Sequence, residues 1–207
     1  MPTAQPGSGP ICHHRKVHPT AQRLADVALR RFEDRGYDNT TTAEIAAAAG
    51  VTQRTFFRHF ASKHDVLFAD NDESTRDFVE LLYGQPPELR LTDALIETIA
   101  KHAQRWPPTN DDVTRVRIAR ETASLNDIIA TLHVEFERTL VRWIAQRSGR
   151  SEFDFDVRVV AATLVAARRV VVDEWIESAD RADVVELARR AIGAVDASAI
   201  DPERNSG

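Results

Sequence analysis

Apolar residues recur every three to four positions along most of this 207-residue chain, which is the period of an amphipathic helix. In the first such stretch, 20–35, the apolar stripe contains Leu24, Ala28 and Phe32, and Gly36 follows as a residue that ends helices. Further helices are predicted over 42–49, 53–59, 63–83, 92–105, 111–122, 125–147, 156–177 and 182–195. No stretch has the alternating period of a strand, so we expect an all-α fold of about nine helices.

The stretch 41–60 holds two short predicted helices joined at Gly50. Thr41 suits the N-cap of the first helix, and Glu44 three places later completes a capping box. Apolar residues in both helices would hold them together, while the long polar side chains of the second helix point away. This is the pattern of a helix-turn-helix, so we predict a three-helix DNA-binding domain over 19–64.

The charge of the chain is divided unevenly. Residues 1–63 contain nine Lys and Arg and five Asp and Glu, whereas the whole chain contains 27 and 32 and has a net charge of −5. A basic first part indicates a surface that faces phosphate. The helix predicted over 63–83 would run without a break from this part into the acidic remainder and could transmit movement. Residues 1–18 and 201–207 are expected to be disordered tails. The basic run at 13–16 either lies along a phosphate backbone or reaches a minor groove, or it is simply solvated.

Other classes of protein fit the composition poorly. The single cysteine, Cys12, allows no disulfide framework within one chain, which favours a reducing compartment. No apolar run is long enough to cross a membrane, and the first ten residues do not have the pattern of a signal peptide. We therefore expect a soluble, cytoplasmic protein with no membrane partner.

The remaining residues, 65–200, are predicted to form a second helical domain, and two of its helices are suited to dimerisation. Helix 156–177 is apolar over a wide arc, and helix 182–195 has a face of small apolar residues. Two such helices from each of two chains would form a four-helix bundle, although both could instead be core helices of a monomer. The residues predicted for the dimer interface are Val160, Leu164, Val171, Leu187, Ala188, Ala191 and Ile192.

Residues over 20–66 resemble the TetR family of transcriptional regulators. The residues that carry this resemblance are Leu24, Ala28, Phe32, Gly36, Thr41, Ile45, Ala46, Ala49, Gly50, Val51, Thr55, Phe56, Phe57, Arg58, His59, Phe60, Ser62 and Lys63. The run RTFFRHF followed by SK resembles the actinobacterial branch that includes the mycofactocin-system regulator and relatives with acyl-CoA-type ligands. Two positions depart from the family: Phe57 replaces a tyrosine whose hydroxyl commonly binds a phosphate oxygen, and Ala43 replaces a base-reading arginine of some relatives.

The predicted DNA contacts lie mainly on the second helix of the motif. In a major groove, Arg54 can bind guanine and Gln53 can bind adenine, each with two hydrogen bonds, while Thr55 can touch a thymine methyl or a phosphate. Thr41 and Thr42 can present hydroxyls and backbone amides to phosphate. The resemblance implies further contacts to the DNA backbone at His59 and Lys63. Phe57 can pack against a sugar or a thymine methyl, and Arg58 either contributes positive charge or faces the first helix.

The resemblance also implies a homodimer that represses transcription from an inverted-repeat operator and is released by a small hydrophobic or acyl-CoA-type effector. No cofactor and no metal are expected. Aromatic residues and arginines of the C-terminal helices are the candidates for effector binding: Trp106, Arg120, Phe136, Leu140, Trp143, Arg168 and Trp175. Arg120 and Arg168 could each bind an anionic group of the effector, or both could be surface residues or pair with Glu121 or Asp173.

Two alternative functions remain open at this stage. His133 and Glu137 share a helix face and could serve as an acid–base pair or as metal ligands in a helical enzyme. A second histidine at metal-ligand spacing, a nucleophile motif and a glycine-rich phosphate loop are all missing from the sequence, so we predict no enzyme and no catalytic residue. A protein-interaction module with a vestigial helix-turn-helix would have no need of Arg54, His59 and Lys63.

Overall fold

The computed structural model describes residues 18–69, 71–178 and 183–195, and every regular element within them is helical. The helices are α1 (Pro19–Arg35), α2 (Thr42–Ala48), α3 (Gln53–His59), α4 (Lys63–Leu67), α5 (Asn71–Tyr83), α6 (Leu91–Arg105), α7 (Asn110–Glu121), the 3-10 helix η1 (Ala123–Leu125), α8 (Asn126–Ser148), α9 (Phe155–Glu177) and α10 (Val184–Gly193). The predicted all-α fold is confirmed. Within the described ranges, no helix is long and apolar enough to span a membrane.

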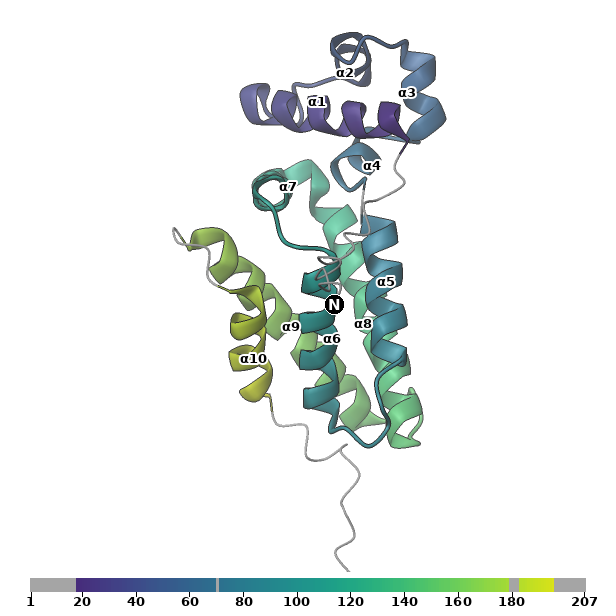
Figure 1. Cartoon of the computed structure of the whole chain (residues 1–207), viewed down its shortest axis with the longest axis vertical. Helices are drawn as coiled ribbons and strands as arrows, with labels where there is room; N and C mark the ends of the chain where they lie inside the picture. The colour runs from purple at the N-terminus through teal and green to yellow at the C-terminus, as the bar shows by residue number, and fades with distance from the viewer. Residues whose placement is uncertain (1–17, 70, 179–182, 196–207) are drawn as a thin grey trace, which may run out of the picture.

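Helices α1 to α4 form a small domain at one end of the elongated molecule (Figure 1). Its core contains Leu24, Phe32, Ile45 and Phe56, all with at most 2% of their surface exposed. The turn between α2 and α3 needs Gly50, whose φ of 69° lies in the left-handed region that favours glycine. These apolar contacts and this turn fix α3 against α1 and α2, as the sequence predicts.

Helices α5, α6, α8, α9 and α10 form the larger body, with α9 packed against both α8 and α10 (Figure 1). Trp143 of α8 is 3% exposed, and its indole Nε1 donates a 3.0 Å hydrogen bond to the carbonyl oxygen of Leu82 at the end of α5. This bond satisfies the one polar group of the indole. It contributes to the stability of the fold, because a buried N–H group without a hydrogen-bond partner costs free energy.

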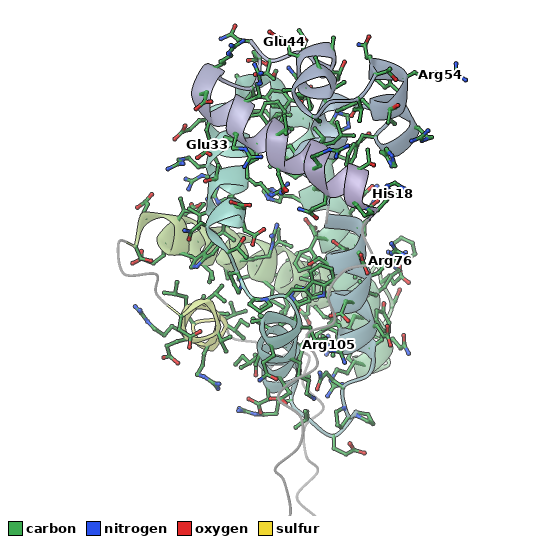
Figure 2. The ribbon with its side chains drawn as sticks, turned by 45° about the horizontal axis from the view of Figure 1, so that its top comes forward. His18, Glu33, Glu44, Arg54, Arg76 and Arg105 are labelled. Atoms are coloured by element: carbon green, nitrogen blue, oxygen red, sulfur yellow. The ribbon has the colours of Figure 1, made fainter. Side chains whose placement is uncertain are left out.

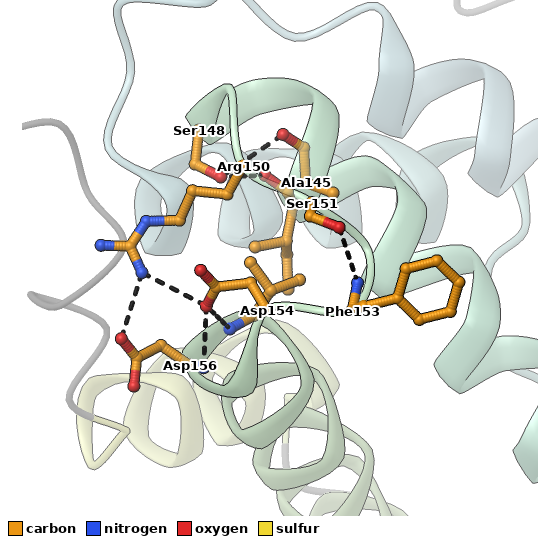
Figure 3. A network of polar contacts seen from close by, with 9 residues as sticks. Ala145, Ser148, Arg150, Ser151, Phe153, Asp154 and Asp156 are labelled. Carbon is orange, nitrogen blue, oxygen red and sulfur yellow. Dashed lines mark hydrogen bonds and ion pairs between the residues drawn. The ribbon is translucent and has the colours of Figure 1, made fainter.

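The turn from α8 to α9 is held by polar contacts (Figure 3). Gly149 ends α8 in the left-handed conformation, and the Asp154 side chain then caps α9 by accepting hydrogen bonds from the amides of Asp156 and Val157. Arg150 bridges both acidic residues, at 3.4 Å from Asp154 and 3.1 Å from Asp156. The turn therefore fixes the direction in which α9 leaves α8.

Helix α7 lies between the two domains and contacts both. Its Ile118 and Ala119 are buried in the core of the N-terminal domain, together with Leu125 of η1. Arg117 pairs with Glu33 of α1 at 3.4 Å, and Arg115 donates a 2.9 Å hydrogen bond to the carbonyl oxygen of Leu67. The hydrophobic core of the N-terminal domain thus extends beyond the boundary predicted at residue 64.

The prediction of one continuous helix over 63–83 is wrong. Helix α4 ends at Leu67, where Phe68 leaves the helical conformation with φ −104° and ψ 27°, and α5 begins at Asn71. Leu67 is 1% exposed in the N-terminal core, so packing fixes the end of α4. Acidic residues in the first turn of α5, Asp72 and Glu73, favour a new helix start through the helix dipole.

The residues predicted for the dimer interface lie mostly inside a single chain. Val160, Leu164, Val171, Leu187, Ala188 and Ile192 are each at most 9% exposed, and Ala191 is partly buried against the same core. They hold α9 and α10 to each other and to the rest of the body, so little of their surface remains exposed for contact with a second chain. Of the predicted tails over 1–18 and 201–207, every residue except His18, the N-cap of α1, lies outside the described residues, and so does the basic run at 13–16.

Candidate DNA-binding face and effector region

The exposed side chains of α3 form a polar face on the outside of the N-terminal domain. Thr52 caps the helix by accepting a hydrogen bond from the amide of Thr55, and the two threonine hydroxyls are 3.0 Å apart. Gln53, Arg54 and Arg58 are exposed, and Figure 2 shows Arg54 projecting away from the rest of the molecule. A helix with this free polar face can enter a major groove without displacing its own packing.

The start of α2 stands beside this face and orients it. The predicted capping box is present, because the Thr41 hydroxyl accepts a hydrogen bond from the Glu44 amide and the Glu44 carboxylate accepts a 2.9 Å hydrogen bond from the Thr41 amide. Hydrogen bonds from Thr41 lower the pKa of Glu44, so this carboxylate stays ionised. Across the turn between α2 and α3, the Gln53 side-chain amide donates to the Thr42 hydroxyl at 3.0 Å, which holds Gln53 in one orientation.

Lys63 is turned toward its own domain. Its ammonium nitrogen Nζ donates a 2.8 Å hydrogen bond to the Tyr37 carbonyl oxygen and lies 4.1 Å from the centre of the Tyr37 ring. Burial lowers the pKa of Lys63, and burial raises the pKa of Tyr37 to about 12. The predicted contact of Lys63 with a DNA backbone would require the lysine to give up these interactions.

His59 and Phe57 complete the predicted contact set at the end of α3. The His59 ring lies 4.8 Å from the His18 ring, its Nε2 atom is buried without a hydrogen-bond partner, and desolvation lowers its pKa. Phe57 is 49% exposed and meets Phe56 edge-on at 5.4 Å. An exposed aromatic ring beside Arg54 and Arg58 offers an apolar surface to a sugar or a thymine methyl, but no hydrogen-bond donor.

The structure brings three of the predicted effector residues into one region of the larger body. The Arg168 guanidinium of α9 lies 4.8 Å from the centre of the Phe136 ring of α8. The centre of the Phe136 ring lies 5.7 Å from that of Phe78 of α5, and the centre of the Phe78 ring lies 5.5 Å from that of His102 of α6. Trp106 stacks on His102 at 6.4 Å, so one chain of rings joins α5, α6 and α8.

The other four predicted effector residues have structural roles. Leu140 and Trp143 are 1% and 3% exposed in the core, and Trp175 is 9% exposed beside them. Arg120 forms an ion pair with Asp173 at 3.2 Å, which links α7 to α9. Sequence reasoning missed Phe78 and His102, although His102 stands one helical turn before Trp106 and could have been found by that spacing.

His133 and Glu137 do not gain a catalytic setting. Burial lowers the pKa of His133, and the positive charges of Arg168 and Arg169 lower it further. Two neighbouring arginines disfavour a bound metal cation at this histidine. Within the part of the chain that the structure describes, no three His, Cys, Asp or Glu residues are placed to hold a metal ion.

Comparisons with known proteins match both domains. Residues 24–69 match the model of bacterial regulatory proteins of the tetR family, and residues 85–199 match the MftR C-terminal domain. The chain belongs to the TetR family. This TetR-family protein is 32% identical over 181 residues to the HTH-type transcriptional regulator TcmR of Streptomyces glaucescens, with 84% of this chain and 80% of TcmR covered.

A second relative is the protein of Mycobacterium tuberculosis assigned as the mycofactocin biosynthesis regulator MftR. It is 26% identical over 183 residues, which cover 87% of this chain and 92% of MftR. Among solved structures, SmeT of Stenotrophomonas maltophilia in complex with triclosan has a TM-score of 0.65 at 18% identity, with 91% of this chain and 94% of SmeT covered, and shares the fold. Family membership makes this TetR-family protein a DNA-binding transcriptional regulator rather than an enzyme.

Proposed function

We propose that this regulator is a cytoplasmic repressor that binds an inverted-repeat operator as a homodimer and leaves it when a small apolar, anionic effector binds. The observation that carries the proposal is the exposed polar face of α3. In a dimer, two such helices about 34–36 Å apart would reach successive major grooves on one side of the duplex.

Base recognition is assigned to Arg54 and Gln53. Arg54 is free to reach the O6 and N7 atoms of a guanine, and such a bidentate contact contributes about 1–3 kcal/mol of discrimination. The hydrogen bond to Thr42 orients Gln53 before DNA arrives. Arg58 lies one turn after Arg54 and contributes positive charge toward the phosphates.

The homodimer is supported by the outer surface of α9. Val159 and Val170 are 44% and 59% exposed, and Ala162 and Ala166 are exposed between them. These four positions follow helical spacing and form a stripe of small apolar residues opposite the buried stripe of Val160 and its neighbours. An exposed apolar stripe on a long helix is suited to the same helix of a second chain, as a two-fold interface requires.

The effector is assigned to the region around Arg168 and Phe136. Arg168 lies on the inward stripe of α9, in helical register with Leu164, Val171 and Trp175, which are all buried, yet Arg168 itself is exposed. The helices around Arg168 are therefore open to solvent on one side. Desolvation still lowers the pKa of Arg168, which favours an anionic group as its partner. The rings of Phe136 and Phe78 would contact the apolar part of the effector.

Helix α7 provides the physical connection between effector and DNA. Arg120 binds Asp173 on α9, less than two turns after Arg168, and Arg117 binds Glu33 in the N-terminal domain. An effector that shifts α9 would change the position of α7 and, with it, the separation of the two α3 helices. The effector must bind the two arrangements differently, with a coupling of about 1–3 kcal/mol in typical cases.

DNA binding is tested by fluorescence anisotropy with DNA from upstream of the protein's own gene. Arg54→Ala should reduce the preference for operator over unrelated DNA. Arg58→Ala should weaken binding to both kinds of DNA and lower the salt dependence by about two units of slope, one for each protomer of the dimer. An Arg54→Ala protein as selective as the wild type would refute the assignment of base recognition.

Effector binding is tested by thermal shift with acyl-CoAs of several chain lengths. The melting temperature should rise for the wild type and rise less for Arg168→Gln, with Arg169→Gln as the neighbouring control. If no acyl-CoA stabilises the protein, the acyl-CoA class is wrong while the DNA-binding proposal stands.

Dimerisation is tested by analytical ultracentrifugation. Val170→Glu should dissociate the dimer, whereas Val134→Glu should not, because Val134 is 46% exposed on α8 and lies outside the stripe. A wild-type monomer at micromolar concentration, or a dimer that tolerates Val170→Glu, would contradict the proposed interface.

A further inference from the structure

Gln53 and Thr42 stand next to each other on the proposed DNA-binding face, although their positions in the sequence differ by 11. Each is the first residue of its helix, Gln53 of α3 and Thr42 of α2. The turn between the two helices is tight, with a 2.9 Å hydrogen bond from the Val51 amide to the Ala46 carbonyl oxygen. The starts of α2 and α3 are therefore held in a fixed relation by the fold of the small domain (Figure 1).

The side-chain amide of Gln53 is oriented by a single hydrogen bond. Its nitrogen Nε2 donates to the Thr42 hydroxyl at 3.0 Å, and the amide makes no other hydrogen bond with the residues that the structure describes. Neighbouring threonine hydroxyls on this face are engaged elsewhere: those of Thr52 and Thr55 are 3.0 Å apart, and that of Thr41 belongs to the capping box of α2. Thr42 is therefore the residue that controls which way the amide is turned.

The direction of this hydrogen bond decides what Gln53 offers to a base. The Nε2 group has two hydrogens, so after one is given to Thr42 the amide still presents one N–H donor and the acceptor Oε1. Adenine presents the complementary pair in the major groove, the acceptor N7 and the donor N6. Guanine presents two acceptors, N7 and O6, and its O6 atom would face Oε1. The observed orientation therefore favours adenine and opposes guanine.

The reversed amide would have the opposite preference. If Oε1 accepted a hydrogen bond from Thr42, the NH2 group would turn toward the base and present two donors, as guanine requires. A glutamine amide without a fixed partner can adopt both orientations, because its last torsion is broad and roughly two-fold. An unrestrained Gln53 would thus discriminate poorly between the two purines.

DNA itself would fix the direction of the hydrogen bond. A hydroxyl has one hydrogen to donate, and the Thr42 hydrogen has no acceptor among the described residues. Thr42 is partly exposed, so a phosphate oxygen can reach it. Since a phosphate oxygen only accepts, it takes the hydroxyl hydrogen and leaves Thr42 with lone pairs alone for Gln53. The Nε2 atom must then be the one that faces Thr42.

We propose that Thr42 is a positioning residue that makes Gln53 selective for adenine. The Thr42 hydroxyl donates to a phosphate oxygen and accepts from Nε2, and the rest of the Gln53 amide binds the N6 and N7 atoms of the base. This inference rests on the proposed function, because α3 must lie in the major groove. It adds that Thr42 contributes to sequence specificity through Gln53, although phosphate contacts alone carry no sequence information.

The experiment compares affinities for operator variants by fluorescence anisotropy at one salt concentration. Selection from random DNA with the wild type and with Gln53→Ala first identifies the operator position that depends on Gln53. The preference for adenine over guanine at that position is then measured for two variants of the full chain. Thr42→Val has the same shape as the wild-type side chain but no hydroxyl, whereas Thr42→Ser keeps the hydroxyl.

Thr42→Val should lower the preference for adenine over guanine by about three- to tenfold in each half-site, which is the range of one net hydrogen bond. Thr42→Ser should retain the preference. Loss of the phosphate contact weakens binding to both DNAs alike and cancels in the ratio. The operator position that depends on Arg54 is the internal control, and its base preference should be the same in all three proteins.

Four results would overturn the proposal. They are a Gln53-dependent position that does not favour adenine, an unchanged preference in Thr42→Val, an equal loss in Thr42→Ser, and an equal loss at the position that depends on Arg54. The last would mean that the substitution acts through the fold. If recognition by Arg54 persists while any of these is observed, this inference alone fails. If Arg54→Ala is as selective as the wild type, the proposed base recognition fails with it.

Discussion

Replacing Phe57 by tyrosine should increase affinity for DNA of every sequence. The ring is 49% exposed on the face of α3 that we propose enters the major groove, and its edge contact with Phe56, at 5.4 Å between ring centres, fixes its direction. The family commonly has tyrosine here, where the hydroxyl binds a phosphate oxygen. Phe57→Tyr would restore that donor without disturbing the core, because the added oxygen enters solvent.

The size of the effect follows from the hydrogen bond alone. A net contribution of about 0.5–1.5 kcal/mol per hydrogen bond, made twice in a dimer, gives about 1–3 kcal/mol, or roughly five- to hundredfold in affinity. Stability should change by less than about 0.5 kcal/mol, as for other surface substitutions. A neutral hydroxyl releases no counterion, so the slope of log affinity against log salt should stay the same.

The assay is anisotropy with operator and unrelated DNA at several salt concentrations. Phe153→Tyr is the matched control, because Phe153 is 88% exposed in the turn between α8 and α9, far from α3 (Figures 1 and 3). Unchanged affinity would mean that Phe57 does not approach a phosphate. A gain restricted to the operator would mean that the ring reads a base, since phosphate contacts carry no sequence information.

Three further predictions concern stability. Trp143→Phe should lower the free energy of unfolding, measured with urea, by about 1–3 kcal/mol, because it removes the buried donor to the Leu82 carbonyl oxygen. A decrease below about 0.5 kcal/mol would contradict this explanation. Thr41→Ala should lower the free energy of unfolding, measured by thermal unfolding, by about 1 kcal/mol, because it removes the cap of α2. The control Thr131→Ala, on the exposed side of α8, should lower it by less. Burial lowers the pKa of His102 in the folded state, so the unfolded chain binds the proton more readily: stability should be level above about pH 6.5 and fall below it. His102→Gln should reduce that fall, and an identical pH profile would exclude His102 as its source.

The positions of the helices could be predicted from sequence because their signals are local. Spacing of apolar residues, caps such as Thr41 and Ser62, and glycines such as Gly149 place nearly every helix end within two residues of its observed position. The break between α4 and α5 was missed because it depends on a distant contact. Leu67 is held in the N-terminal core, and no feature within 63–83 itself requires the helix to end there.

The candidate sites were predicted less completely, because hydrophobicity indicates burial without indicating what covers a residue. Helix α9 is apolar on two sides, and the sequence does not say whether Val160 or Val159 faces the body. Likewise Trp143 and Trp106 are the same residue type, yet one fills the core and the other stacks at the edge of the effector region. Such distinctions depend on the angle at which α8, α9 and α6 meet.

The burial of Ile118 and Leu125 within the N-terminal core limits how this regulator can be recombined with others. A fragment that ends after α4 would expose the apolar surface that α7 and η1 normally cover. A chimera that joins this DNA-reading end to a foreign sensor should therefore keep residues 110–125, together with Glu33 as the partner of Arg117. The exchangeable unit is discontinuous in sequence, and a single cut between the two family modules would separate parts that fold together.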